Sequence, residues 1–155
     1  MTHKYHWEDF QVGPPIELGR HTITRDEIVD FAKRYDPQPF HVDEAAAAQS
    51  FYGGLIASGW HTCAITMRLM CDSYLLDSAS MGSPGVENLR WLRPVRPDDT
   101  LRVMRTVLET RTSASRPEMG IVKFLWEVFN QSSEIVMSME GYGLFRRRPA
   151  QSAQG

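Results

Sequence analysis

Two side chains that can transfer protons, a carboxylate and an imidazole, stand five positions apart at Asp36 and His41. Pro37 and Pro39 restrict the backbone between them, because a proline locks its own φ and pushes the preceding residue away from the helical region. We therefore expect a non-helical loop that aims both groups at one point. A fully extended loop would hold them up to roughly 16 Å apart. A shared acid/base role thus requires the loop to fold back.

The helices expected on either side bear on the charge of this pair. Asp36 follows a helix-like run over residues 25–34, whose partly negative end disfavours a carboxylate. His41 precedes a helix opened by Asp43, whose partly positive end disfavours an imidazolium. Both effects favour the neutral forms, which suit proton transfer near neutral pH. The alternative is structural, because such an aspartate is commonly a turn former and a single loop histidine is commonly a surface residue.

The size and charge of the chain exclude several classes of function. At 155 residues without a polar linker, we expect a single domain over residues 1–155. The formal charge is -2, from 17 basic and 19 acidic residues, so no net basic field favours nucleic acid or an anionic membrane. The start lacks the apolar core of a signal peptide, and no apolar run is long enough to span a bilayer. We expect a soluble cytoplasmic protein that binds neither nucleic acid nor membrane.

The cysteines and histidines predict neither a disulfide nor a metal site. Cys63 and Cys71 fall within one expected helix, whose rise separates their Cα atoms by about 12 Å. Bridged Cα atoms lie within about 7 Å, so an intrachain disulfide is excluded and the two residues fit a reducing compartment. No set of cysteines and histidines has the spacing of a zinc site. We expect no metal and no cofactor.

Helical patterns come early in the chain and strand patterns come late. We expect helices over residues 24–34, 43–49 and 60–76, strands over 16–23, 85–94, 100–110, 121–130 and 135–145, and a flexible tail over about 146–155. This order indicates an α+β fold in which the longest helix covers one face of an antiparallel sheet. One helix leaves part of a broad sheet uncovered, so we expect a homo-oligomer, most simply a homodimer. The strand residues expected to leave apolar surface for a second subunit are Trp91, Leu92, Phe124, Trp126 and Phe129.

Residues 36–43, Asp-Pro-Gln-Pro-Phe-His-Val-Asp, carry a family resemblance. The stretch resembles the loop pattern Asp-Xaa-Asn-Pro-hydrophobic-His-Xaa-Asp of the MaoC-like dehydratases, with Gln38 where asparagine is usual. These dehydratases are relatives of the (R)-specific enoyl-CoA hydratases and share the hot-dog fold. Residues 57–59, Ala-Ser-Gly, match the family's small-residue helix start, and residues 85–101 match its later strand and turn. The likeness runs from Phe10 to about Phe145. It implies a single hot-dog domain, with an antiparallel sheet wrapped around a long central helix.

The resemblance implies catalytic roles at three positions. Asp36 and His41 resemble the pair that holds and activates a water for addition to a trans-2-enoyl-CoA, which gives an (R)-3-hydroxyacyl-CoA. The Gly59 N–H resembles the donor that binds the thioester oxygen. Physical chemistry supports this, because a glycine at a helix N-terminus offers an uncovered N–H and allows close approach. The alternative for Gly59 is a glycine required by packing.

Four further residues are assigned to substrate binding, namely Gln38, Phe40, Ser58 and Trp60. Ser58 occupies the place before the glycine where many hydratases of the family carry histidine. His61 either lines the pocket or is buried and hydrogen-bonded, and we expect the second.

The function expected is therefore that of a hydro-lyase acting on an acyl-CoA, without metal or redox cofactor. One alternative is an acyl-CoA thioesterase, in which water attacks the carbonyl carbon instead of Cβ. The other is a non-catalytic protein that binds acyl thioesters. The chemistry of the loop favours the lyase, whereas a resemblance of fold alone decides nothing.

Overall fold

The computed structural model describes residues 2–150 and confirms the α+β expectation. The helices are η1 (Trp7–Asp9, a 3-10 turn), α1 (Arg25–Tyr35), α2 (Pro39–Val42), α3 (Glu44–Ala48), α4 (Gly59–Met70) and η2 (Cys71–Leu75, a π-helical turn). The strands are β1 (Ile16–Thr22), β2 (Val86–Trp91), β3 (Thr100–Thr112), β4 (Met119–Phe129) and β5 (Ile135–Arg146).

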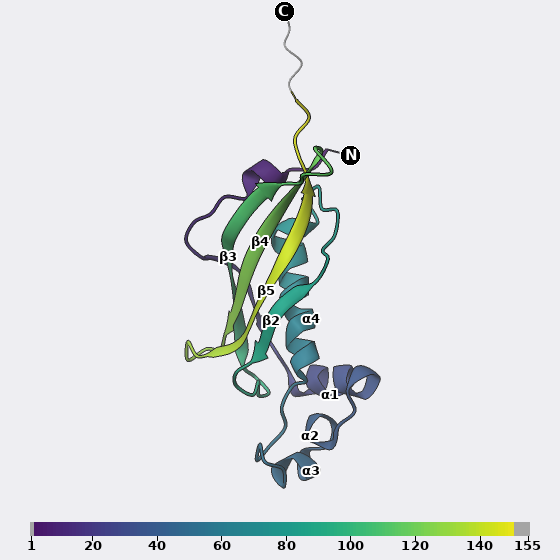
Figure 1. The fold of residues 1–155 in the computed structure, drawn as a ribbon. Coiled ribbons are helices and arrows are strands. Elements are labelled where there is room, and N and C mark those ends of the chain that lie inside the picture. Colours follow the sequence, from purple (N-terminus) through teal and green to yellow (C-terminus); the bar gives the residue numbers. More distant parts are fainter. Residues whose placement is uncertain (1, 151–155) are drawn as a thin grey trace, which may run out of the picture.

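The strands form one antiparallel sheet in the order β1-β3-β4-β5-β2. Burial along β4, the central strand, alternates strictly, as expected for a strand with one face in the core. Its buried side chains join Ile65 and Met70 of α4 in one hydrophobic core. Figure 1 shows the sheet curving around α4, which runs along one face. This is the hot-dog arrangement that the resemblance implies.

The central helix is continuous from Gly59 to Leu75, because α4 passes directly into η2. The Ser58 side chain caps its N-terminus by accepting a hydrogen bond from the Trp60 N–H. The expected helix over residues 60–76 is thus confirmed to within one residue at each end. Its first residue is Gly59, so the first turn of the helix lies at the lower end of α4 in Figure 1, beside α1.

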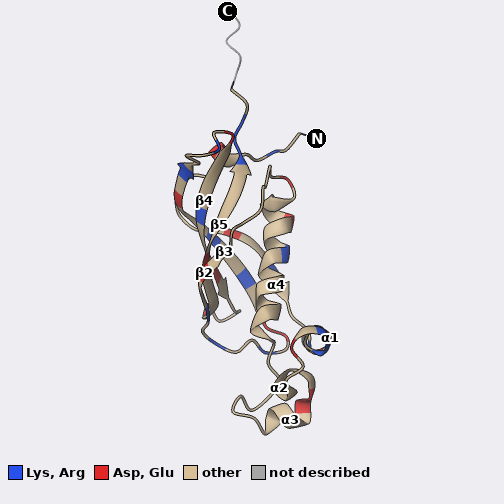
Figure 2. Ribbon diagram, turned by 45° about the vertical axis from the view of Figure 1, so that its right-hand side comes forward, with Lys and Arg blue, Asp and Glu red and all other residues tan. Residues whose placement is uncertain are grey.

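The short helices α1, α2 and α3 form an overhang, residues 25–48, beyond the N-terminal end of α4 (Figures 1 and 2). Thr24 caps α1 by accepting the Glu27 N–H at 3.2 Å. Asp43 caps α3 by accepting the Ala46 N–H at 3.0 Å. Both helices were predicted from these capping residues. Figure 2 shows basic and acidic residues interspersed along the ribbon rather than gathered on one side.

The loop between α1 and α3 differs from the prediction, because it contains a helical turn. Pro39 begins α2, since the φ of proline suits the first position of a helix, where no N–H is needed. The residues before the prolines are non-helical, as expected: Asp36 has φ -153° and ψ 68°, and Gln38 has φ -69° and ψ 143°. The prediction that residues 37–42 contain no helix was therefore wrong.

The apolar strand residues assigned to a subunit surface fall into two groups. Phe124 and Trp126 are buried in the core, because they lie on the face of β4 that α4 covers, so their assignment to a surface was wrong. Trp91 and Leu92 lie at the exposed edge formed by β2. Phe129, the last residue of β4, is half-buried.

Strand β5 ends at Arg146, the first residue of the expected tail. The Arg147 N–H donates to the Glu118 carbonyl at 2.8 Å, and Arg148 Nη2 donates to Asp9 Oδ2 at 2.7 Å. The rest of that tail, residues 151–155, lies outside the described residues. Within residues 2–150, none of the helices is long and apolar enough to cross a membrane.

Candidate active site

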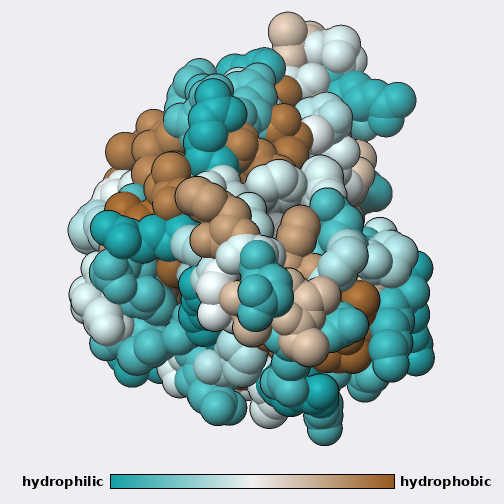
Figure 3. Space-filling view, turned by 90° about the horizontal axis from the view of Figure 1, so that it is seen from below, coloured by the Kyte–Doolittle hydropathy of each residue, from teal (hydrophilic) through white to brown (hydrophobic). Residues whose placement is uncertain are grey.

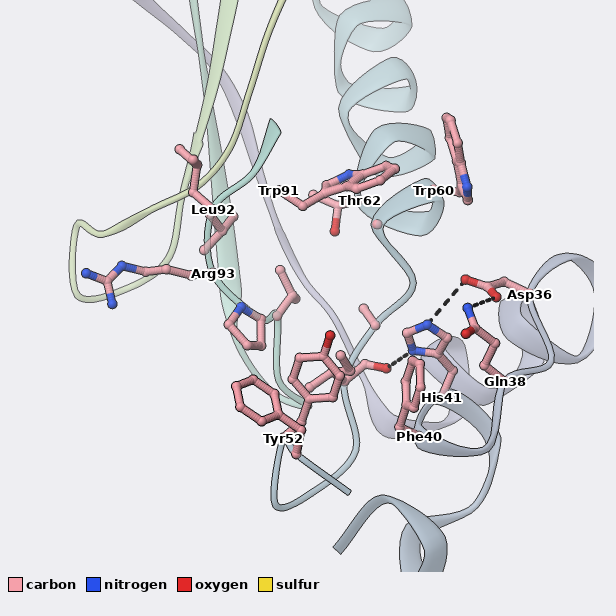
Figure 4. A pocket seen from close by; sticks show the side chains of 17 residues that line it. Asp36, Gln38, Phe40, His41, Tyr52, Trp60, Thr62, Trp91, Leu92 and Arg93 are labelled. Atoms are coloured by element: carbon pink, nitrogen blue, oxygen red, sulfur yellow. Dashed lines mark hydrogen bonds and ion pairs between the residues drawn. The ribbon is translucent and has the colours of Figure 1, made fainter. Parts of the chain in front are cut away.

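A cavity of about 520 Å3 lies between the overhang, the first turn of α4 and the segment that follows β2. Figure 4 shows side chains from these three regions converging on it, and Figure 3 shows scattered hydrophobic areas on the otherwise hydrophilic surface at this end of the molecule. The volume falls within the range of roughly 300–1,000 Å3 that is typical of small-molecule sites. Of the seven residues assigned from the sequence, six line it: Asp36, Gln38, Phe40, His41, Gly59 and Trp60.

The carboxylate of Asp36 and the imidazole of His41 are adjacent. Oδ2 of Asp36 lies 3.2 Å from Nε2 of His41, and Figure 4 shows the two groups turned toward each other. Asp36 caps the C-terminus of α1 and His41 lies in α2, so the helical turn folds the loop back as a shared role requires. His41 is only 4% exposed, and the Asp36 side chain is 17% exposed. The arrangement can transfer protons to a molecule held in the cavity.

The segment that leads into α4 fixes the orientation of the His41 ring. Nδ1 of His41 lies 2.7 Å from the carbonyl oxygen of Ile56, and a carbonyl only accepts, so Nδ1 carries the hydrogen. The Ile56 N–H in turn donates to the Phe40 carbonyl at 3.2 Å. Because Nδ1 donates its hydrogen to the Ile56 carbonyl, Nε2 is the nitrogen that gains or loses a proton beside Asp36.

Two side chains donate hydrogen bonds to the Asp36 carboxylate. Gln38 Nε2 reaches Oδ1 at 2.7 Å, and Ser58 Oγ reaches Oδ2 at 2.7 Å. Partial burial raises the pKa of Asp36, but these two donors and the nearby His41 outweigh it, and the pKa lies below its ordinary value. The expectation of a neutral Asp36 was therefore wrong, because short hydrogen bonds act more strongly than the end of α1.

Gly59 meets the packing requirement that the sequence left as one of two alternatives. It opens α4 and lines the cavity, and among residues 2–150 no acceptor is paired with its N–H. A Cβ at this position would lie 2.3 Å from Cε2 of Trp91, so only glycine fits beneath the indole ring. The ring of Trp91 also contacts that of Trp60 edge to face, with centroids 5.0 Å apart. The position thus requires glycine for packing, and its N–H is left without an acceptor among the described residues.

Ser58 and His61 are buried and do not line the cavity, so neither is placed to contact a substrate. Ser58 was assigned to substrate binding, but its side chain has no exposed surface and it does not line the cavity. His61 is buried as expected and stacks on Phe31 with ring centroids 4.5 Å apart. Its Nδ1 has no hydrogen-bond partner among the described residues, contrary to the expected bonding. Burial lowers the pKa of His61 to about 4.

The sequence reasoning missed several residues of the cavity wall, because they come from distant segments. Trp91 was assigned to a subunit surface, and Thr62 and Tyr52 were given no role, yet all three line the cavity. Arg96 fixes the segment that carries Tyr52, since its guanidinium donates to the carbonyls of Tyr52 and Gly54 at 2.5 and 3.2 Å. For Trp91 the sequence carried one signal, the family likeness of residues 85–101. Within residues 2–150, no group of three or more His, Cys, Asp or Glu side chains is placed to hold a metal ion.

Comparisons with known proteins agree with this geometry. The model of the MaoC-like domain family matches residues 9–123. The uncharacterized protein YdeM of Bacillus subtilis is 30% identical over 140 residues, which are 90% of this chain and 98% of that protein. The crystal structure of a MaoC-like dehydratase from Rhodospirillum rubrum has a TM-score of 0.86 at 44% identity, over 94% of this chain and 99% of that one. An R-hydratase from Pseudomonas aeruginosa shares the fold, with a TM-score of 0.75 at 24% identity over 94% of this chain and 88% of that chain. This chain therefore belongs to the MaoC-like dehydratase family.

Proposed function

We propose that the protein is a hydro-lyase that reversibly hydrates a trans-2-enoyl-CoA to an (R)-3-hydroxyacyl-CoA. The observation that carries the proposal is the contact of 3.2 Å between Asp36 and His41 at the wall of a cavity that Gly59 also lines. The membership of the MaoC-like dehydratase family and the fold shared with an R-hydratase support the reaction class.

The acid/base pair supplies the proton transfers of the reaction. A water held against Asp36 Oδ2 and His41 Nε2 loses a proton to the pair while its oxygen forms a bond to Cβ. The π electrons of the C=C bond move toward the thioester oxygen, and the pair then returns a proton to Cα. The net change is the addition of one water, so the pair ends in its starting state. Positioned acid/base groups of this kind contribute about 10²- to 10⁴-fold to a rate.

The Gly59 N–H stabilises the negative charge that forms on the thioester oxygen. It lies at the N-terminus of α4, where the helix dipole favours negative charge, and it has no competing partner among residues 2–150. A single donor of this type is worth about 10²- to 10³-fold in other enzymes.

We further propose a homodimer in the cytoplasm. An exposed edge supports the dimer: β2 is the last strand of the sheet, and Val86, Trp91 and Leu92 present apolar surface along it. The free thiols of Cys63 and Cys71 support a reducing compartment. Sedimentation of the purified protein should give twice the mass of the chain. A monomer at micromolar concentration would contradict the dimer.

The hydration is tested by the loss of enoyl absorbance with crotonyl-CoA and with a longer trans-2-enoyl-CoA, while a thiol reagent monitors free coenzyme A. Asp36→Asn and His41→Ala should each lower the rate by about 100-fold or more. Asp30→Asn, an exposed aspartate on α1, is the matched control and should leave the rate unchanged. Release of thiol would instead identify a thioesterase. Binding of the thioester without either signal would identify a non-catalytic binding protein.

A further inference from the structure

We infer that Ser58 is a positioning residue, whose buried hydroxyl ties the Asp36 carboxylate to the N-terminus of α4 and so fixes the acid/base pair relative to the Gly59 N–H. The inference rests on the proposed function and deepens it. It also gives Ser58 a role other than the substrate contact expected from the sequence, because a side chain with 0% exposure cannot touch a substrate.

Four hydrogen bonds tie Ser58 to the protein. Its hydroxyl has one hydrogen, which is donated to Asp36 Oδ2 at 2.7 Å, and its oxygen accepts the Trp60 N–H at 3.3 Å. Its backbone carbonyl accepts the N–H groups of His61 and Thr62 at 2.9 and 3.2 Å. The side chain is therefore locked to the first turn of α4, and the carboxylate is locked to the side chain.

This bond joins two parts of the site that come from different elements. Asp36 belongs to the overhang, whereas Gly59 belongs to the central helix. Hydration needs the water at Cβ and the donor at the thioester oxygen at the same moment, so the distance between the two parts must be constant. A misplacement of about 1 Å can cost a reaction about 100-fold. Ser58 is the side chain that links Asp36 directly to the helix on which the Gly59 N–H stands.

The same bond also affects the charge of the pair. Burial raises the pKa of Asp36, and the Ser58 hydroxyl is one of the donors that lower it. Removal of the hydroxyl leaves the half-buried carboxylate with fewer donors, so the pKa of Asp36 should rise. A serine that acted only as a helix cap would affect stability but would not change the ionisation of Asp36.

The test compares Ser58→Ala and Ser58→Thr with a matched buried serine, Ser78→Ala. Ser78 lies beyond the far end of the central helix, where its hydroxyl donates to the Tyr74 carbonyl and not to a carboxylate. For each variant, kcat/KM of enoyl-CoA hydration is measured across pH. The 13C NMR signal of the Asp36 carboxyl is titrated in parallel, because this signal needs no activity.

Ser58→Ala should lower kcat/KM by about 10- to 100-fold, the scale of a lost hydrogen bond to a charged group. The acid limb of its pH profile and the titration of Asp36 should both move to higher pH. Ser58→Thr should restore the rate and the wild-type titration, and Ser78→Ala should keep both. The inference is overturned if Ser58→Ala titrates Asp36 as the wild type does, or if its rate is unchanged. Failure of Asp36→Asn to slow hydration would instead refute the proposed function. The NMR titration would still show whether the hydrogen bond from Ser58 lowers the pKa of Asp36.

Discussion

An alanine at position 59 should displace the indole of Trp91. Its Cβ would lie 2.3 Å from Cε2, 2.5 Å from Cδ2 and 2.6 Å from Nε1 of that ring. Non-bonded carbon atoms in contact are roughly 3.5–4.0 Å apart, so the indole must retreat by more than about 1 Å. These atoms belong to a rigid bicyclic ring, which moves only as a whole. The edge-to-face contact with Trp60 is then disturbed as well.

The displacement has an expected cost in both stability and rate. Overpacking of this kind typically costs about 1–3 kcal/mol, so Gly59→Ala should lower the free energy of unfolding in urea by about that amount. The hydration rate should fall by about 100-fold, the scale of one misaligned oxyanion donor, because the ring and the N–H share one wall of the cavity. The measurements are urea denaturation and loss of enoyl absorbance.

A double-mutant cycle with Trp91→Ala separates packing from catalysis. Because alanine keeps the backbone N–H, Gly59→Ala should cost little stability and little activity once the indole is absent. A coupling energy of about 1–3 kcal/mol would therefore assign the requirement for glycine to Trp91. Wild-type stability and rate in Gly59→Ala would refute the geometric reasoning. Equal losses in both backgrounds would mean that position 59 requires glycine for a reason unrelated to the indole.

Three further predictions concern residues around the cavity. The free energy of unfolding should fall by about 3 kcal/mol between pH 6.5 and 4, because buried His61, with a pKa of about 4, excludes a proton that the unfolded chain binds. Urea unfolding measured across this pH range checks this, and His61→Phe should flatten the dependence of the free energy on pH. Gln38→Ala, which removes an exposed hydrogen bond to Asp36, should lower kcat/KM about three- to tenfold, whereas no loss would make that bond unimportant. Arg96→Ala should raise KM and lower the thermal midpoint, because Tyr52 loses its anchor; unchanged values would contradict this role.

Most of the fold follows from local patterns in the sequence. The mixture of β-branched and aromatic residues in 121–130 predicts a strand, and the capping residues Thr24 and Asp43 predict the starts of two helices. The end of β3 and the start of β4 were each placed two residues short, because polar residues near Thr112 pair in the ladder without facing the core. Such pairing depends on the partner strand and leaves no periodic signal.

The site was less predictable than the fold, because much of it is formed by contacts between distant segments. The types and spacing of Asp36 and His41 identify the pair, but the Ile56 carbonyl that orients the ring is a backbone group that no motif records. Ser58 was assigned to substrate binding because it occupies the place before the glycine where many hydratases of the family carry histidine. The direction of the serine side chain depends on the end of α1, which lies twenty-two positions earlier.

The error about the loop shows how two prolines can bring a pair together. Each proline excluded a helical residue before it, and the conformations of Asp36 and Gln38 agree with that. The same rule places no limit on the residues after a proline, where a fixed φ favours a helix start. Pro37 therefore ends α1 at the carboxylate, while Pro39 starts the turn that carries His41 back toward it. The backbone conformations set by the two prolines bring the two groups to 3.2 Å, and one hydrogen bond from outside the loop reaches each group, from Ser58 to Asp36 and from His41 to Ile56.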